Sequence, residues 1–236
     1  MNLSTNTEKK HQSGFTLLEL LIVVSIIAIL SVALILVLNP AEALKKSRDS
    51  QRLSDLSTMK TALGLYMTST TTPQLAGTSN AACKTTPATA WAGPFKIYYS
   101  SPTSVTDVTL DGSTVTTVAQ ASVGSANLGL TDGGGWIPVI FDSLTGGSPI
   151  SNLPIDPVNA LASGGSLAAI TSADLFYRYA CSVTPLAFEI DSTLESTAYT
   201  SEDNKLTKDG GNSTLYYEVG TNLKILGAGG SSALDF

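Results

Sequence analysis

The chain has 236 residues, of which 14% are charged, and its formal net charge is −6 at pH 7. From Pro73 to the end it carries six basic and fourteen acidic residues. Such an acidic region repels phosphate, so we expect no direct binding of nucleic acid. The one histidine is His11, and neither a Walker-type loop nor a Gly-x-Ser-x-Gly elbow occurs. The sequence therefore predicts that the protein is not an enzyme.

A polar segment, residues 1–14, precedes an apolar run at residues 15–38. The run is long enough to cross a bilayer as a helix, and Glu19 is its only charged residue. A carboxylate within a membrane span costs about 2.5–3.5 kcal/mol at the centre and less near the end. Glu19 therefore needs a partner or a function.

Two ordinary interpretations of this segment are open. In the first, it is a simple membrane anchor that tolerates Glu19. In the second, it is a secretory signal peptide cleaved near Ala41-Glu42-Ala43. The apolar run is longer than the roughly 7–15 residues usual in signal peptides. A bare count of Lys and Arg on its two sides would place the C-terminal side inside the cell, but long domains translocate with little regard to charge.

The segment GFTLLELLIVVSIIAIL, residues 14–30, follows Lys9 and Lys10. It resembles the N-terminus of type IV pilins and type II secretion pseudopilins. The resemblance implies that prepilin peptidase cleaves the Gly14–Phe15 bond and that Phe15 becomes the N-methylated first residue. It also implies a single-pass protein of the cytoplasmic membrane whose globular domain lies outside the cytoplasm.

The same resemblance assigns Glu19 to filament assembly. Cleavage would expose an amine at Phe15 that is largely cationic at neutral pH. Pairing between Glu19 and the Phe15 amine of a neighbouring subunit would neutralise both groups and fix the register of docking. Phe15 and Glu19 also have helical i,i+4 spacing, so pairing within one chain is the competing arrangement.

Beyond the apolar run, Asn39-Pro40 predicts a kink or a local break, after which helix resumes to residue 67. An apolar stripe on this second helix, at three- and four-residue steps, predicts packing against a sheet. The stripe comprises Leu53, Leu56, Met59, Leu63, Tyr66 and Met67.

Residues 68–236 predict a globular β-rich domain with many turns. Strands are expected at 95–101, 105–110, 114–118, 136–142, 175–181, 186–191 and 215–219, with a long surface connection at 143–172. Helices first and strands afterwards indicate an α+β fold. The predicted architecture is a long N-terminal helix, half membrane-spanning (15–38) and half amphipathic (39–67), packed on an antiparallel sheet in a pilin-like manner.

The two cysteines, Cys83 and Cys181, form either a disulfide or two separate buried thiols. An exported domain would permit the bond, which would close a loop worth about 4–5 kcal/mol in the chain-entropy model.

Two groups of polar side chains are candidates for chemistry. Glu189 and Asp191 share one face of an expected strand, where a solvated surface is the interpretation we favour over acid–base work. A loop with Asp203, Asn204, Asp209 and Asn212 offers hard oxygen ligands for calcium, which major pseudopilins carry in a C-terminal loop. An ordinary turn explains the same residues, and no other cofactor is expected.

The sequence thus predicts a structural subunit of a type IV pilus-like filament. Its partners would be copies of itself, related pilins, prepilin peptidase, an inner-membrane assembly platform and the lipid bilayer. The alternatives are a major pseudopilin of a type II secretion system that drives protein export, and a membrane-anchored binding domain that never polymerises. The pilus subunit would become part of an extracellular pilus, and the pseudopilin would become part of a periplasmic pseudopilus.

Overall fold

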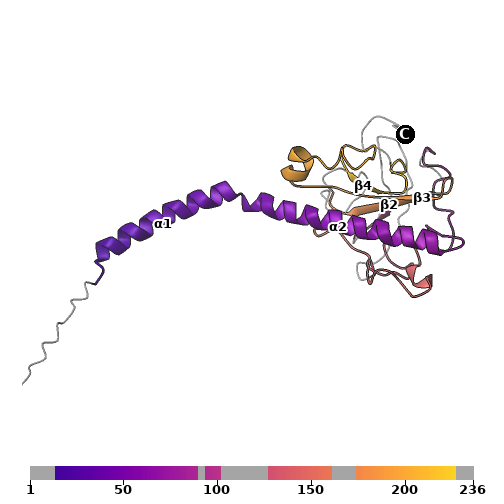
Figure 1. Cartoon of the computed structure of the whole chain (residues 1–236), viewed down its shortest axis with the longest axis horizontal. Coiled ribbons are helices and arrows are strands. Elements are labelled where there is room, and N and C mark those ends of the chain that lie inside the picture. The colour runs from indigo at the N-terminus through magenta and orange to yellow at the C-terminus, as the bar shows by residue number, and fades with distance from the viewer. Residues whose placement is uncertain (1–13, 90–93, 102–126, 161–173, 227–236) are drawn as a thin grey trace, which may run out of the picture. The chain divides into compact units, whose positions relative to one another are not determined.

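The computed structural model describes residues 14–89, 94–101, 127–160 and 174–226 (Figure 1). The chain divides into two compact units, Met1–Ala43 and Leu44–Phe236. Two helices come first and a four-stranded antiparallel sheet follows. This arrangement confirms the predicted α+β fold class.

Helix α1 spans Leu17–Leu38 and is apolar on every side. All of its described apolar side chains are exposed in the structure. Its two serines, Ser25 and Ser31, donate their hydroxyls to the carbonyls four residues earlier, at 2.7 Å in each case. Because these hydroxyls are satisfied inside the helix, they add little cost to a position in lipid or among other helices.

The break predicted at Asn39-Pro40 is confirmed. Asn39 ends α1 in the left-handed conformation, with φ 39° and ψ 69°. Helix α2, Pro40–Ser69, begins on the next residue, where proline is well tolerated because its missing N–H would have no partner in a first turn. The carbonyl of Asn39 accepts the amides of Glu42 and Ala43, which gives the new helix its first hydrogen bonds.

The apolar stripe of α2 packs into the core of the globular domain, as predicted. Leu56, Met59, Leu63 and Tyr66 are buried there, whereas Leu53 and Met67 are half-buried. Their neighbours are side chains from one face of the sheet: Tyr177, Tyr179, Cys181, Phe188, Ile190 and Val219. Burying such side chains stabilises the domain by roughly 1.5–3 kcal/mol each.

The sheet has strand order β1-β2-β3-β4, each strand antiparallel to its neighbour. The strands are β1 (Tyr98–Tyr99), β2 (Tyr177–Ser182), β3 (Ala187–Ser192) and β4 (Tyr217–Gly220). These correspond to four of the predicted strands, although β1 is much shorter than expected. Its ladder with β2 ends because the amide of Tyr177 donates to the hydroxyl of Ser100, 2.8 Å away, instead of to a backbone carbonyl.

One predicted strand is wrong. Residues 136–142 form only an isolated bridge between Asp132 and Ile140, followed by the short helix η1, Phe141–Ser143. Pro138 has no N–H to give to a ladder, and the turn that bends the chain back includes Gly133 at φ +90°. The segment packs as buried irregular chain. The strands expected at 105–110 and 114–118 lie outside the described residues, as does part of the 143–172 connection.

The second face of the sheet is buried as well, which corrects the prediction of a solvated surface at Glu189 and Asp191. Their exposed fractions are 0% and 1%. Arg178 on β2 lies directly opposite Asp191 and forms a buried ion pair with it. The ring of Tyr216 lies 3.8 Å from the Arg178 guanidinium. The chain after η2 (Ala198–Glu202) therefore contributes to covering this face.

Charged side chains also fasten α2 to the loops of the domain. Arg52 is fully buried and pairs with Asp156 at 2.6 Å, Asp49 at 2.8 Å and Glu195 at 2.7 Å. Glu195 also pairs with the partly exposed Arg48. Hydrogen bonds from Arg48 and Arg52 lower the pKa of Glu195 to about 2, so this carboxylate is ionised under ordinary conditions.

A disulfide joins Cys83 to Cys181, with the two Cα atoms 4.7 Å apart. It links the segment before β1 to the middle of the sheet. The backbone amide of Lys84 donates to the carbonyl of Cys181 at the same place, so the two segments are also paired through their main chains.

Gly135 and Gly64 provide a matched pair of substitutions. A Cβ at Gly135 would overlap the carbonyl oxygen of Leu130, whereas one at Gly64, inside α2, would meet nothing within 4 Å. We expect Gly135→Ala to destabilise the domain by about 1–3 kcal/mol. Gly64→Ala should stabilise it by about 0.5–1 kcal/mol, because alanine loses less backbone freedom in a helix. Guanidinium unfolding of the full chain in detergent, followed by tryptophan fluorescence, measures both; equal effects would contradict the packing described.

The two arginines of α2 should differ sharply in their contribution to stability. Arg52→Met leaves the buried carboxylates of Asp49 and Asp156 without their cation, so we expect a loss of about 3–5 kcal/mol. Arg48→Met removes a partly exposed pair and should cost less than about 1 kcal/mol. The same unfolding measurement separates them, and a similar small cost for both would show that Arg52 is not the centre of the cluster.

Candidate functional site: the N-terminal processing and assembly segment

The predicted cleavage point lies just before the first helix. Gly14 and Phe15 precede α1, and Thr16 is its N-cap. A Cβ at Gly14 would meet nothing within 4 Å, and the Phe15 side chain is 90% exposed. The peptide bond between them is therefore open to another protein in this unit of the chain.

Glu19 is held by Thr16 in the full-length chain. Its carboxylate accepts the Thr16 amide and the Thr16 hydroxyl, both at 2.9 Å, while its own amide donates to that hydroxyl at 3.2 Å. This reciprocal capping box satisfies two helix-terminal amides, and the negative charge lies at the positive end of the helix dipole. The carboxylate of the full-length chain therefore has hydrogen-bond donors within its own helix end.

Thr16 is a residue that our sequence interpretation missed. The pattern Thr16-Leu17-Leu18-Glu19 is a capping-box sequence directly before an apolar run, so the signal was present. We had considered only the Phe15 amine as a partner for Glu19. In the structure the amide and the hydroxyl of Thr16 are the groups that contact the Glu19 carboxylate.

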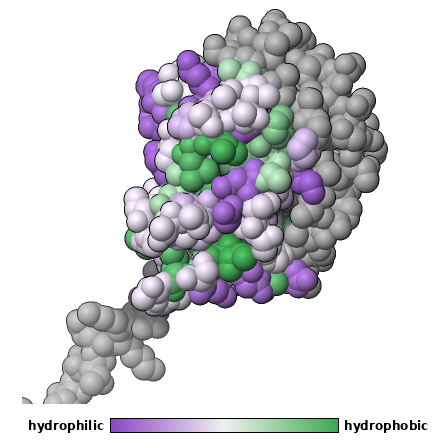
Figure 2. All heavy atoms as spheres, turned by 90° about the vertical axis from the view of Figure 1, so that its right-hand side faces the viewer, coloured by the Kyte–Doolittle hydropathy of each residue, from purple (hydrophilic) through white to green (hydrophobic). Residues whose placement is uncertain are grey.

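Helix α1 is the one helix among the described residues that is long and apolar enough to cross a membrane; the apolar window is Leu17–Ile35. Its side chains contrast with the surface of the globular domain. On the face shown in Figure 2, hydrophobic side chains occur in small separate areas among polar ones. The large exposed apolar surface of the described chain therefore belongs to α1.

The basic residues that follow α1 are not all available to lipid or to a neighbouring subunit. Arg48 and Arg52 are engaged in the ion pairs described above. Lys46 is exposed and lies 5.8 Å from the ring centre of Tyr199. Of the four cations that follow α1 (Lys45, Lys46, Arg48 and Arg52), Lys46 is therefore the exposed one.

The four residues considered for calcium do not form a cation cage in this structure. Both carboxylate oxygens of Asp203 pair with lysines, at 2.5 Å to Lys205 and 2.7 Å to Lys208. The carboxylate of Asp209 accepts hydrogen bonds from the backbone N–H groups of Gly211 and Glu218. The side-chain oxygen of Asn204 accepts one from the backbone N–H group of Leu206. The described residues hold no group of three or more His, Cys, Asp or Glu arranged for a metal. In this structure Asp203, Asn204 and Asp209 thus hold their own turns, and calcium binding at these residues and Asn212 stays a prediction.

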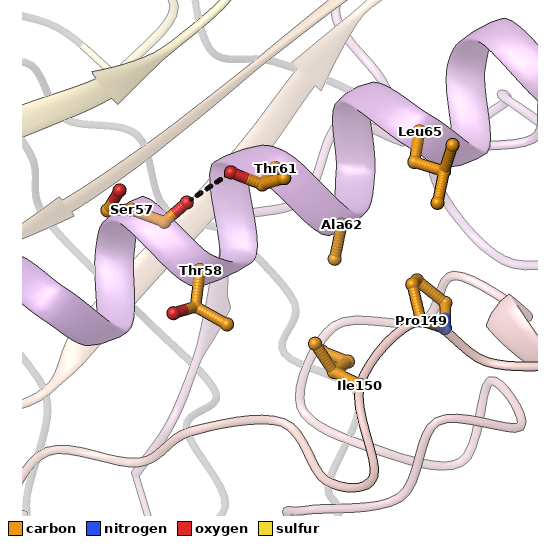
Figure 3. A pocket seen from close by; sticks show the side chains of 7 residues that line it. All are labelled: Ser57, Thr58, Thr61, Ala62, Leu65, Pro149 and Ile150. Carbon is orange, nitrogen blue, oxygen red and sulfur yellow. Dashed lines mark hydrogen bonds between the residues drawn. The ribbon is translucent and has the colours of Figure 1, made fainter.

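A small hollow lies between α2 and the loop at Pro149 and Ile150 (Figure 3). Its volume is about 260 Å³, and Thr58, Ala62 and Leu65 line its helical side. The Thr61 hydroxyl, also on this wall, donates to the backbone carbonyl of Ser57. The described lining has hydroxyl and apolar groups and no ionisable side chain, so this hollow offers no acid, base or metal ligand.

Comparison with known proteins identifies the N-terminal segment. Residues 9–35 match the family model described as the prokaryotic N-terminal methylation motif. This match covers the cleavage point, Glu19 and most of α1, and it confirms the prepilin-type motif of type IV pilins and pseudopilins. The match covers the N-terminal segment alone, which is similar to that of type IV pilins and pseudopilins. The comparisons with curated proteins and with solved structures gave no match.

Proposed function

We propose that this protein is a structural subunit of a type IV pilus-like filament. Prepilin peptidase cleaves it after Gly14, Phe15 is methylated, and the mature chain polymerises through residues 15–38. The observation that carries the proposal is the methylation motif on an exposed, wholly apolar helix with one carboxylate at its start. Such a helix needs lipid before assembly and other helices after it.

The proposal gives each segment of the chain a task. Residues 1–14 form the leader, residues 39–67 join the filament core to the outside, and residues 68–236 form the surface domain. The domain lies outside the cytoplasm, an environment in which the Cys83–Cys181 disulfide persists.

Cleavage changes the partner that Glu19 needs. In the full-length chain the carboxylate is satisfied by Thr16, whereas cleavage creates a cationic amine at Phe15 that must also be neutralised on leaving the membrane surface. A neighbouring Glu19 supplies the opposite charge. Docking is then favourable where an amine and a carboxylate coincide, which sets the register of the filament.

A periplasmic pseudopilus would use the same N-terminal segment. We therefore propose a pilus-like filament without choosing between these two assemblies. The length of the filaments on cells that express the protein at natural levels distinguishes a surface pilus from a pseudopilus. A non-polymerising anchor would instead remain uncut and monomeric in detergent.

We expect Glu19→Ala to leave cleavage intact but to reduce filaments at least tenfold. The variant removes one member of a buried pair, which typically costs about 3–5 kcal/mol. Ser25→Ala is the matched control, since it removes a polar group from the same helix without changing its charge. Immunoblots of sheared filaments and negative-stain microscopy measure assembly, and mass spectrometry of membranes measures cleavage. Normal filament abundance in Glu19→Ala would contradict the proposed role.

A further inference from the structure

The buried second face of the sheet carries two carboxyl groups that none of the functions above uses. Glu189 lies on β3 and Glu218 on β4, with exposed fractions of 0% and 1%. One oxygen of each is satisfied by backbone amides. Glu189 Oε2 accepts those of Ile225 at 2.6 Å and Leu226 at 2.9 Å. Glu218 Oε2 accepts that of Ser213 at 2.8 Å.

The other oxygen of each group lacks such a donor. Glu189 Oε1 and Glu218 Oε1 are both buried, and no N–H or O–H group of the described residues donates to either. The strand register places the two side chains next to each other. Asp191 lies directly opposite Glu218, so Glu189, two residues away on the same face, is its diagonal neighbour and long side chains reach one another. Burial raises the pKa of both carboxyl groups, and the Glu189 carboxyl group raises that of Glu218 further.

The charges around the pair do not neutralise it. Arg178 on β2 is committed to Asp191, whose own charge adds to the negative field. On the loop side, Asp209 accepts the backbone amide of Glu218, and Tyr216 lies over Arg178. Lys84, from the segment before β1, directs its ammonium to the carbonyl of Ile225 at 3.0 Å. Two buried carboxylates on neighbouring positions repel each other, so we expect one of the two groups to be protonated.

We propose that Glu189 and Glu218 share a single proton, and that this acid–carboxylate pair is a pH-sensitive lock on the chain at Ile225 and Leu226. The proton on Glu218 Oε1 is donated to Glu189 Oε1, which keeps Glu189 Oε2 in place to hold the two amides. Loss of the proton sets two carboxylates against each other and weakens this attachment. A proton suits the site better than a metal ion, since the described residues hold no group of three or more His, Cys, Asp or Glu arranged for a metal.

The direction of the pH effect follows from the folded and unfolded states. Burial and the neighbouring carboxyl group raise the pKa of Glu218 far above its ordinary value. The folded chain therefore binds one more proton than the unfolded chain once the pH exceeds about 4.3, the ordinary value for Glu. Stability is greatest in mild acid and falls as the pH rises, by up to about tenfold in the folding constant per pH unit.

The experiment compares the full-length chain with Glu218→Gln in detergent, by guanidinium unfolding between about pH 5 and about pH 8. Glutamine keeps the shape and supplies an N–H donor to Glu189 without a titrating proton. We expect the two proteins to have similar folding constants at about pH 5. As the pH rises, the unmodified chain should lose stability relative to Glu218→Gln, and the ratio of the two folding constants should change by up to about tenfold per pH unit. Glu202→Gln, on the exposed η2, is the control and should follow the unmodified chain.

Two further readouts identify the proton itself. The infrared spectrum of the unmodified chain near neutral pH should contain a carboxylic-acid C=O band that Glu218→Gln lacks. Hydrogen exchange of the Ile225 and Leu226 amides should speed up with pH more steeply than the intrinsic exchange rate of an unprotected amide does. This extra increase should occur only in the chain that has both carboxyl groups. Glu189→Gln serves the same comparison if Glu218→Gln does not fold.

A ratio of folding constants that stays constant with pH, or the absence of the acid band, would overturn the proposal. So would stabilisation of the unmodified chain, but not of Glu218→Gln, by millimolar calcium at the alkaline end, because a cation would then occupy the place of the proton. None of these outcomes depends on filament assembly, so the lock is tested separately from the proposed function.

Discussion

A single carboxylate in an apolar helix is the constraint on which the N-terminal half of this protein depends. Glu19 has to be neutralised wherever α1 goes, because an ionised group is costly in hydrocarbon and in a packed helical core. In the full-length chain Thr16 donates hydrogen bonds to the carboxylate through a capping box, which stabilises the charge without removing it. On the proposed function, removal of the leader would introduce an amine one residue before Thr16, and this amine would give the carboxylate an oppositely charged partner. The proposed change from a membrane protein to a filament subunit would then rest on one covalent cut.

The globular domain solves a different problem, which is to attach a long helix firmly to a small sheet. The apolar stripe of α2 covers one face of the sheet, and the buried Arg52 fixes the helix to loops that carry Asp156 and Glu195. Ion pairs of this kind contribute directional contacts more than net stability, since desolvation offsets much of their attraction. The opposite face carries Arg178 with Asp191 and the carboxyl pair of Glu189 and Glu218. The domain thus buries charged side chains both between α2 and its loops and on the second face of the sheet, where few ordinary domains have them.

Local patterns predicted the helices and most of the sheet, because periodicity, capping and turn residues act over a few positions. They also contained the capping box at Thr16. They did not predict burial of Glu189 and Asp191, since the segment containing Tyr216 and Leu226, which packs over them, lies some distance along the chain. Two of the three partners of Arg52 are likewise 104 and 143 residues away. At residues 136–142, residue types that are common in strands predicted a strand, but Pro138 and the preceding turn prevent one from forming. Burial and long-range charge pairing are properties of the assembled fold, which one sequence does not display.

The central claim, that this chain is processed as a prepilin for assembly, is tested most directly by its mass. The protein is taken from its own membranes, and its intact mass is measured with fragment ions that cover the N-terminus. The account predicts a chain that begins at Phe15 and carries one additional methyl group. A chain that begins at Met1 would contradict it, and Glu19 would then be the cap of an ordinary membrane anchor.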